Sequence, residues 1–473
     1  MPHFTTCQTA PRLTVDHQFA RAFPAMSLES FGYEDQLDRA LSPLDLIVYG
    51  MIFMVPIAPF SVFGFVWNDA HGMVVLAYLI GMAGMLFTAL SYAAMSQAFP
   101  LAGSVYAYVQ RGLHETLGFF AGWLILLDYI LIPALLYLFS AVALQPLLPG
   151  IPISIWLIAF VAVNATANLL GVRFTARLYK TLLALELLTL AIFIAFGLRA
   201  LYMGAGAGHL TLQPLYDPKK FSLTTVAGAT SIAVLSFLGF DGISTLSEES
   251  ADSHKGIARA TVLSLILIGA LFVLQTWIAA DLAQGMHFHS AATAFYQVAD
   301  RAGGPVLKMV AILAVVISFG IANAMAAQAA VSRVLFAMAR DRKLPAALAI
   351  VHPRFKTPYV STLLVAAVSL LVGLIFVKHI DDLSRVVNFG ALSSFAMLHV
   401  AVVYHYFFKK RTGAWVKHLL CPVAGFVVIL YVLAGMDNTA KILGASWVVL
   451  GIVYYIVLSR FGANRTRLNE LNS

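Results

Sequence analysis

About twelve runs of apolar residues, each long enough to cross a lipid bilayer, follow one another along this chain. With 60% hydrophobic and 11% charged residues, the chain carries more apolar surface than a soluble globular protein buries. The sequence therefore predicts an all-α polytopic membrane protein. The predicted spans cover residues 44–66, 73–97, 117–145, 152–171, 179–202, 225–247, 258–280, 305–333, 359–377, 384–407, 417–435 and 442–460.

The basic residues are distributed unevenly between the two sides of the predicted membrane domain. If both termini are cytoplasmic, all but eight of the 30 Lys and Arg residues lie on the cytoplasmic side, which is the positive-inside pattern. The net charge of +8 therefore reports topology and does not indicate a nucleic-acid partner. The eight exceptions are Arg199, Lys219, Lys220, Arg301, Lys308, Lys378, Arg385 and Lys441.

No linker divides the chain into soluble domains. The predicted parts are a cytoplasmic leader (1–43), a transporter core (44–407), two peripheral helices, 11 and 12 (408–460), and a cytoplasmic tail (461–473). The leader lacks the apolar core and cleavage site of a signal peptide. A helical patch at 291–302 has two interpretations, an outer cap over the pore or a plain surface helix.

Two of the spans are interrupted near their middle. Pro56 and Pro59 stand in the first span, where each proline removes a backbone N–H and clashes with the preceding turn. In the sixth span, Gly239 and Gly242 flank Asp241, which costs roughly 2.5–3.5 kcal/mol at mid-membrane unless it has a partner or faces water. Paired interruptions predict an inverted repeat, 44–203 and 225–407, with the substrate site between the breaks.

Several short motifs, in order along residues 40–460, give the chain a family resemblance. They lie at 99–106, 122–123, 127–129, 236–241, 245–249, 331–333, 340–341, 344–345, 352–353, 357–358 and 388–390. On these motifs the chain resembles the amino acid–polyamine–organocation (APC) superfamily, and most closely its bacterial putrescine-importer branch. The resemblance implies a LeuT-type fold with a 5+5 inverted repeat and broken helices 1 and 6. It also implies alternating access and proton symport of a small amine such as putrescine across the bacterial inner membrane.

The residues at the two breaks favour an amine as the substrate. Amino acid permeases of the superfamily hold a substrate carboxylate with free N–H groups at the first break, where Pro56 and Pro59 here withhold two donors. Carbonyl acceptors and Asp241 are left to attract an ammonium group. The predicted substrate-binding residues are Val55, Pro56, Ile57, Ala58, Ser61, Asp128, Tyr129, Phe237, Gly239, Phe240, Asp241 and Gly242.

Several of these residues keep an alternative interpretation. Asp128 either completes the amine site beside Tyr129 or pairs with a neighbouring helix, and each aromatic residue either stacks on a cation or packs in the bundle. Ser61 stands where the putrescine importers carry an acidic residue. The alternative function is therefore an amino acid permease or an amino acid/amine exchanger, with the substrate held through Ser61 and the N–H groups of Gly242 and Ile243.

Charged residues outside the breaks suggest coupling and gating. Glu186, an isolated acid in the fifth span, is either the proton carrier or a structural hydrogen-bonding group, and Asn323 in the eighth span is a weaker polar candidate. Four residues at cytoplasmic helix ends either close an inner gate through salt bridges or anchor the topology. These predicted gating residues are Glu248, Glu249, Arg333 and Arg340.

An intramembrane enzyme is disfavoured because no His-Glu-x-x-His motif and no recognisable nucleophile–base pair is present. A channel or a nutrient sensor on the same scaffold stays an alternative. No cofactor and no metal site are expected beyond a coupling ion, H⁺. The expected partners are the small-molecule substrate and the lipid bilayer, with the chain acting as a monomer or homodimer.

Overall fold

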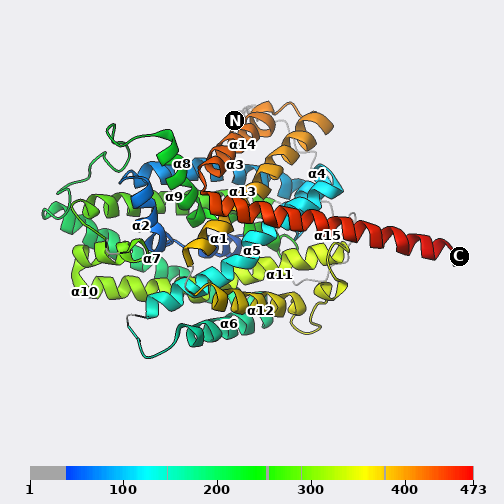
Figure 1. The fold of residues 1–473 in the computed structure, drawn as a ribbon, viewed down its shortest axis with the longest axis horizontal. Coiled ribbons are helices and arrows are strands. Elements are labelled where there is room, and N and C mark those ends of the chain that lie inside the picture. The colour runs from blue at the N-terminus through cyan, green and yellow to red at the C-terminus, as the bar shows by residue number, and fades with distance from the viewer. Residues whose placement is uncertain (1–38, 146, 252–254, 289, 378–379, 472–473) are drawn as a thin grey trace, which may run out of the picture.

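The computed structural model describes residues 39–145, 147–251, 255–288, 290–377 and 380–471, and this part of the chain is helical, without a β-strand. Figure 1 shows the long helices gathered into one bundle, from which the C-terminal part of α15 extends at one end. An all-α polytopic fold is thereby confirmed.

The helices follow the predicted spans closely. The α-helices are α1 (Pro43–Met54), α2 (Pro59–Asp69), α3 (Val74–Ala98), α4 (Ser104–Gly112), α5 (Glu115–Leu144), α6 (Ile153–Leu169), α7 (Val172–Tyr202), α8 (Leu223–Ala233), α9 (Lys255–Ala283), α10 (Ala294–Ile317), α11 (Ala324–Arg340), α12 (Tyr359–Ile375), α13 (Ile380–Val402), α14 (Cys421–Gly435) and α15 (Asn438–Leu471). Short 3₁₀- and π-helical segments join or extend them: η3 (Val234–Phe237), η4 (Phe240–Leu246), η5 (Ala291–Thr293), η6 (Ser318–Asn323), η7 (Ala346–Ala349), η8 (Val403–Lys409) and η9 (Val416–Leu420).

Each predicted span corresponds to an apolar helical stretch of the described chain, and nine or ten of these are long enough to cross a membrane. In the described part of the chain, nine helical stretches are long and apolar enough to cross a membrane, and the bent pair α1–α2 makes a tenth. The shorter apolar helices α6 and α12 correspond to the fourth and ninth predicted spans. The predicted spans do not include α4, an amphipathic nine-residue helix that lies between the second and the third predicted spans.

The first break follows from proline chemistry. Ser42 caps α1 in a capping box with Asp45, and Pro43 occupies the first turn, where its missing N–H is not needed. The helix ends at Val55, whose φ of 55° is left-handed and which precedes Pro56. Pro59 then begins α2, which is inclined by 49° to α1.

The second break follows from a glycine. After η3, Leu238 adopts an extended conformation and Gly239 takes a φ of 117°, a conformation that only glycine adopts without strain. The chain continues as the 3₁₀ segment η4, which carries Asp241 in its first turn. Both interruptions expected from the sequence are therefore present, in the first and the sixth spans.

The patch at 291–302 packs against the second half of the first span. It comprises η5 and the first turns of α10, which kinks at Gly303 and Gly304. The ring of Phe295 stacks on that of Phe60 in α2, with centroids 3.9 Å apart. The patch thus covers α2 at the end of the bundle opposite to the buried ion pairs described below.

Candidate functional site

The two breaks pack directly against each other. A Cβ atom added to Gly239 would lie 2.7 Å from the carbonyl oxygen of Phe53, and one added to Gly242 would lie 2.2 Å from the Phe53 ring. Only glycine permits this approach, because any side chain would collide with the end of α1. The glycines that flank Asp241 therefore bring the two interrupted spans into contact.

The carbonyl groups of the first break already accept hydrogen bonds from the protein. Val55 and Ile57 accept from N–H groups three residues further along, each at 2.9 Å. The carbonyl of Pro56 accepts from the side-chain amide of Gln275 in α9, at 2.8 Å. Each carbonyl oxygen has a second lone pair, so these groups keep acceptor capacity for a cation.

Asp241 is fully buried at the second break. The Tyr129 hydroxyl donates to one of its carboxylate oxygens, and the backbone N–H of Gly239 donates to the other at 3.3 Å. Within the described residues no Lys, Arg or His side chain forms an ion pair with it. In the described part of the chain, only neutral donors therefore hold this carboxylate.

Asp128 supplies a second buried carboxylate beside the first. It precedes Tyr129 in α5, its side chain is 2% exposed, and it lies close enough to Asp241 for the two charges to repel each other. Its Oδ1 atom has no hydrogen-bond partner among the described residues. Two neighbouring buried carboxylates are unfavourable while both are charged and no cation lies beside them.

The predicted aromatic residues fall into two groups. Phe240 packs edge-on against Tyr92 and Phe237 against Phe272, on the side of the break that faces α3 and α9. Tyr129 instead contacts Asp241 and lies 6.5 Å from the ring of Phe53. Of the three aromatic candidates, Tyr129 is the one whose polar end reaches a carboxylate.

An apolar cavity lies beside the first break. It is lined by Phe53, Met54, Ala58, Val62, Ile132, Leu135, Leu136, Phe139, Leu235, Ser236, Leu238, Phe319 and Asn323. Its polar side chains are Ser236, paired with the Tyr78 hydroxyl, and Asn323, whose Oδ1 atom has no partner in the described part of the chain. Ala58 is the predicted substrate-binding residue that lines it; Ser61 is buried nearby in α2.

A second cavity at the end of α2 leads toward the first one. Both are lined by Val62, Phe139 and Leu235, and the second also contacts Ser384, the buried Asn388 and, at its surface end, the exposed Asp69. The first cavity, which we call the central cavity, is therefore approached from the end of the bundle that carries Asp69. We call this end the vestibule end.

Glu186 lies on α7, a helix that packs against α1 and η6. Its side chain is 2% exposed, and neither carboxylate oxygen has a hydrogen-bond partner of good geometry in the described residues. A polar side chain beside it is that of Ser318, the first residue of the π-helical segment η6. Such π-helical turns are frequent at functional sites.

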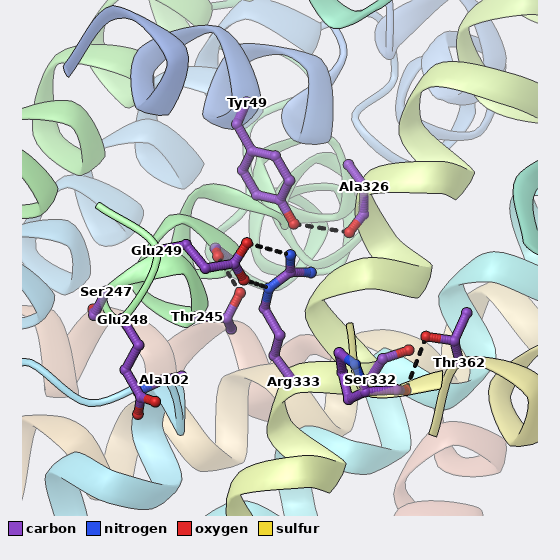
Figure 2. A network of polar contacts seen from close by, with 12 residues as sticks. Tyr49, Ala102, Thr245, Ser247, Glu248, Glu249, Ala326, Ser332, Arg333 and Thr362 are labelled. Carbon is purple, nitrogen blue, oxygen red and sulfur yellow. Dashed lines mark hydrogen bonds and ion pairs between the residues drawn. The ribbon is translucent and has the colours of Figure 1, made fainter. Parts of the chain in front are cut away.

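Two ion pairs close the other end of the bundle. The Arg333 guanidinium contacts both carboxylate oxygens of Glu249, and that of Arg340 donates to both oxygens of Glu248 at 2.8 and 2.9 Å. Glu248 also accepts from the Ala102 N–H at 3.0 Å. Figure 2 shows Arg333 directed at Glu249 from α11, below the Tyr49–Ala326 hydrogen bond. The structure thus joins all four predicted gating residues at what we call the ion-pair end.

The polypeptide before α1 is tied to the same place. Leu41 donates its N–H to the carbonyl of Glu249 at 3.1 Å and accepts from the N–H of Ala251 at 2.9 Å. Asp45, one turn later, binds Lys180 at 2.7 Å. The start of α1 is therefore attached to the ion-pair end.

Two residues at the site were not anticipated from the sequence. Gln275 donates a hydrogen bond to the Pro56 carbonyl. The sequence feature that could have identified it is a single side-chain amide within a predicted membrane span. Phe53 lines the cavity and also packs against Gly242 and Tyr129. Its signal is weaker, because an aromatic residue before a break is indistinguishable from ordinary packing.

The chain was then compared with known proteins. The amino acid permease family model matches residues 45–460. The chain is 28% identical over 435 residues to the low-affinity putrescine importer PlaP of Escherichia coli (strain K12), covering 90% of this chain and 94% of that protein. It is 27% identical over 473 residues to the branched-chain amino acid permease BcaP of Bacillus subtilis (strain 168), covering 92% and 96%. It is 23% identical over 467 residues to a methylthioribose transporter of the same organism, covering 93% and 97%.

Proposed function

The chain belongs to the amino acid permease family, within the APC superfamily, and from that premise we propose that it imports a small amine such as putrescine. Membership of this family makes the chain a membrane transporter of an amino acid or amine. We further propose that it works by alternating access and proton symport in the bacterial inner membrane.

The observation that carries the proposal is the pair Asp241 and Asp128. Burying a carboxylate without a counter-charge is costly, and here two lie together with only neutral donors around them in the described chain. A substrate ammonium group would supply the missing positive charge. Tyr129, which donates to Asp241, would orient one carboxylate toward it.

The surroundings suit the remainder of an amine. The apolar lining of the central cavity matches the methylene chain of a diamine, and the unpaired amide oxygen of Asn323 offers an acceptor within it. Phe53 lines the cavity and also contacts Gly242 and Tyr129, which are next to the two carboxylates. A rotation of its ring would therefore connect the cavity with Asp128 and Asp241. Its face would also attract a cation through the ring quadrupole.

The orientation proposed rests on the charge pattern. Because most Lys and Arg residues lie on the side of the ion-pair end, we place this end and both termini in the cytoplasm. The vestibule end then faces the periplasm. In this arrangement the two ion pairs close the inner gate while the substrate path from outside stays accessible, as the loading step of import requires.

Glu186 is the proposed proton carrier. It is buried on α7 beside Ser318 of the π-helical segment η6, without a strong partner in the described residues, and α7 packs against the first broken span. A carboxyl group there would be neutral in one conformation and ionised in another if water reaches it only in one of them. The packing of α7 against α1 would link protonation to movement of the first break.

A second candidate is an amino acid with an apolar side chain. The cavity lining, almost entirely aliphatic and aromatic, favours it, and one relative is named a branched-chain amino acid permease. Ser61, buried without a hydrogen-bond partner among the described residues, would then contact the substrate carboxylate. In this case the same carboxylate pair would hold the α-ammonium group.

The test is uptake by purified protein in proteoliposomes. Radiolabelled putrescine and isoleucine would be supplied separately, each with and without an inward proton gradient, with unlabelled amines and amino acids as competitors. Gradient-stimulated, concentrative putrescine uptake is the expected result. Uptake of isoleucine alone would establish the second candidate, non-concentrative flux would indicate a channel, and binding without uptake would indicate a sensor.

A further inference from the structure

An apolar groove lies on the outer surface between α13 and α14, away from the substrate path. Its walls include Val400, Val403 and Phe408 from the α13–η8 helix and Pro422, Val423 and Phe426 from α14, with almost no polar surface. Val400 and Val423 are each 45% exposed. Because both helices belong to predicted spans, the groove opens toward lipid hydrocarbon.

The floor of the groove is polar but satisfied. His399 accepts or donates at both ring nitrogens, to Ser91 at 2.9 Å and to Thr88 at 3.2 Å, both in α3. Gly425 of α14 approaches this ring so closely that an added Cβ would lie 2.4 Å from it. Both ring nitrogens of the imidazole are occupied, so it cannot form a hydrogen bond with a ligand. The groove therefore offers a ligand only apolar contact.

The segment that joins the two helices, 409–418, is strongly basic and stands at the end of this groove. Lys409, Lys410, Arg411 and Lys417 are all exposed, and none forms an ion pair with a described residue. Two other lysines at the same end are neutralised by carboxylates. Lys180 binds Asp45, and Lys343 binds Glu115.

This basic segment has a defined conformation. His418 stacks on Tyr406 with ring centroids 4.2 Å apart and binds the Thr412 hydroxyl at 2.7 Å. The Tyr406 hydroxyl donates to the carbonyl of Ala94 in α3 at 2.7 Å, and the Lys410 ammonium lies 5.5 Å from the Tyr406 ring centre. Trp415, 59% exposed, completes the segment with the residue type that favours the membrane interface.

We propose that the groove and the basic segment together bind an anionic phospholipid. One acyl chain lies in the groove along Val400 and Val423, and the headgroup phosphate is held by Lys409, Lys410 and Arg411. A basic segment next to a groove between transmembrane helices is the arrangement expected for recognition of such a headgroup. The site is independent of which substrate the transporter carries.

The test is a lipid titration on delipidated, purified full-length protein, followed by native mass spectrometry. The probes are palmitoyl-oleoyl phosphatidylglycerol and phosphatidylcholine with the same chains. We expect phosphatidylglycerol, the anionic lipid, to bind about tenfold more tightly than phosphatidylcholine, since each Lys or Arg near the surface contributes on the order of a severalfold preference for negative charge. Equal binding of the two lipids would refute the proposal.

Three variants separate the parts of the site. Lys409→Gln combined with Lys410→Gln and Arg411→Gln is expected to abolish the preference. The matched triple Arg342→Gln, Arg354→Gln and Lys356→Gln, on exposed positions at the same end, is expected to retain it. Val423→Trp, which fills the groove, should weaken phosphatidylglycerol binding with the charges intact.

Each contrary result is decisive. Equal loss in both triple variants would reduce the effect to the general positive charge of this end, and unchanged binding by Val423→Trp would remove the acyl chain from the groove. Competition by soluble glycerol 3-phosphate at the lipid's own concentration would make the site one for free phosphate. Should the first triple variant misfold, Lys409→Arg with Lys410→Arg keeps the charge and should keep the preference.

Discussion

The ion-pair end and the region around Asp128 and Asp241, which we call the central site, each bury two neighbouring carboxylates. They differ in whether a cation of the protein pairs with each carboxylate. Glu248 and Glu249 each receive a guanidinium that contacts both carboxylate oxygens. Asp241 receives a hydroxyl and a backbone N–H, the Oδ1 atom of Asp128 receives no hydrogen bond, and no cation from the described chain pairs with either. The first pair is neutralised within the protein, and we propose that a ligand or a proton neutralises the second.

This difference assigns the two regions different energetic roles. A buried ion pair is costly to break because removal of either partner leaves an uncompensated charge. It therefore suits a contact that holds one conformation until a larger change separates its helices. A buried carboxylate without a cation is costly while the site is empty, and that cost is relieved by binding a positive group.

The largest expected effect comes from breaking a pair at the ion-pair end. Arg333→Met leaves Glu249 buried and uncompensated, so the free energy of unfolding should fall by about 3–5 kcal/mol. Denaturant titration of the detergent-solubilised protein measures it. Adding Glu249→Gln to this variant should restore much of the loss; a double variant as unstable as the single one would show that the charge is not the cause.

At the central site the opposite pattern is expected. Asp241→Asn should lower the initial rate of uptake of a cationic substrate more than about 100-fold, because one charge-assisted contact in a buried site is lost. The midpoint of thermal unfolding should stay unchanged or rise, since a buried charge without a cation has been removed. Uptake at the wild-type rate would exclude Asp241 from the site.

Glu186 sharpens the comparison between substrate and proton. Glu186→Gln keeps the shape and removes the ionisable group, so uptake should become independent of the proton gradient while substrate binding changes less than about threefold. The measurement is uptake with and without an imposed gradient, beside equilibrium binding. Gradient stimulation that survives the substitution would assign coupling to another residue.

The smallest effect is expected at an exposed ion pair. Lys343 binds Glu115 at 2.5 Å, but the Glu115 side chain is 64% exposed, so water already screens the charges. Lys343→Gln should change the free energy of unfolding by less than about 1 kcal/mol. A loss as large as that of Arg333→Met would mean that burial does not explain the difference between the ion pairs.

Local chemistry made much of the fold predictable. The ends of the helices follow the predicted spans because bilayer thickness sets their length, and the breaks fall where Pro56 and Gly239 permit no regular helix. The helix α4 was not predicted, because at nine residues and with polar residues among the apolar ones it forms no apolar run long enough to be a span. The association of Glu248 and Glu249 with Arg333 and Arg340 followed from their expected location at one end of the bundle.

The sequence by itself determined that this is a polytopic membrane protein of the amino acid permease family with two interrupted spans. These properties depend on composition, on the conformations open to proline and glycine, and on motifs read in order along the chain. Only the tertiary structure decided which acceptors are already occupied: Gln275 on the Pro56 carbonyl, Tyr129 on Asp241, and nothing of good geometry on Glu186 within the described residues. Such pairings join residues more than a hundred positions apart, so they depend on how the helices pack and leave no periodic trace in the sequence.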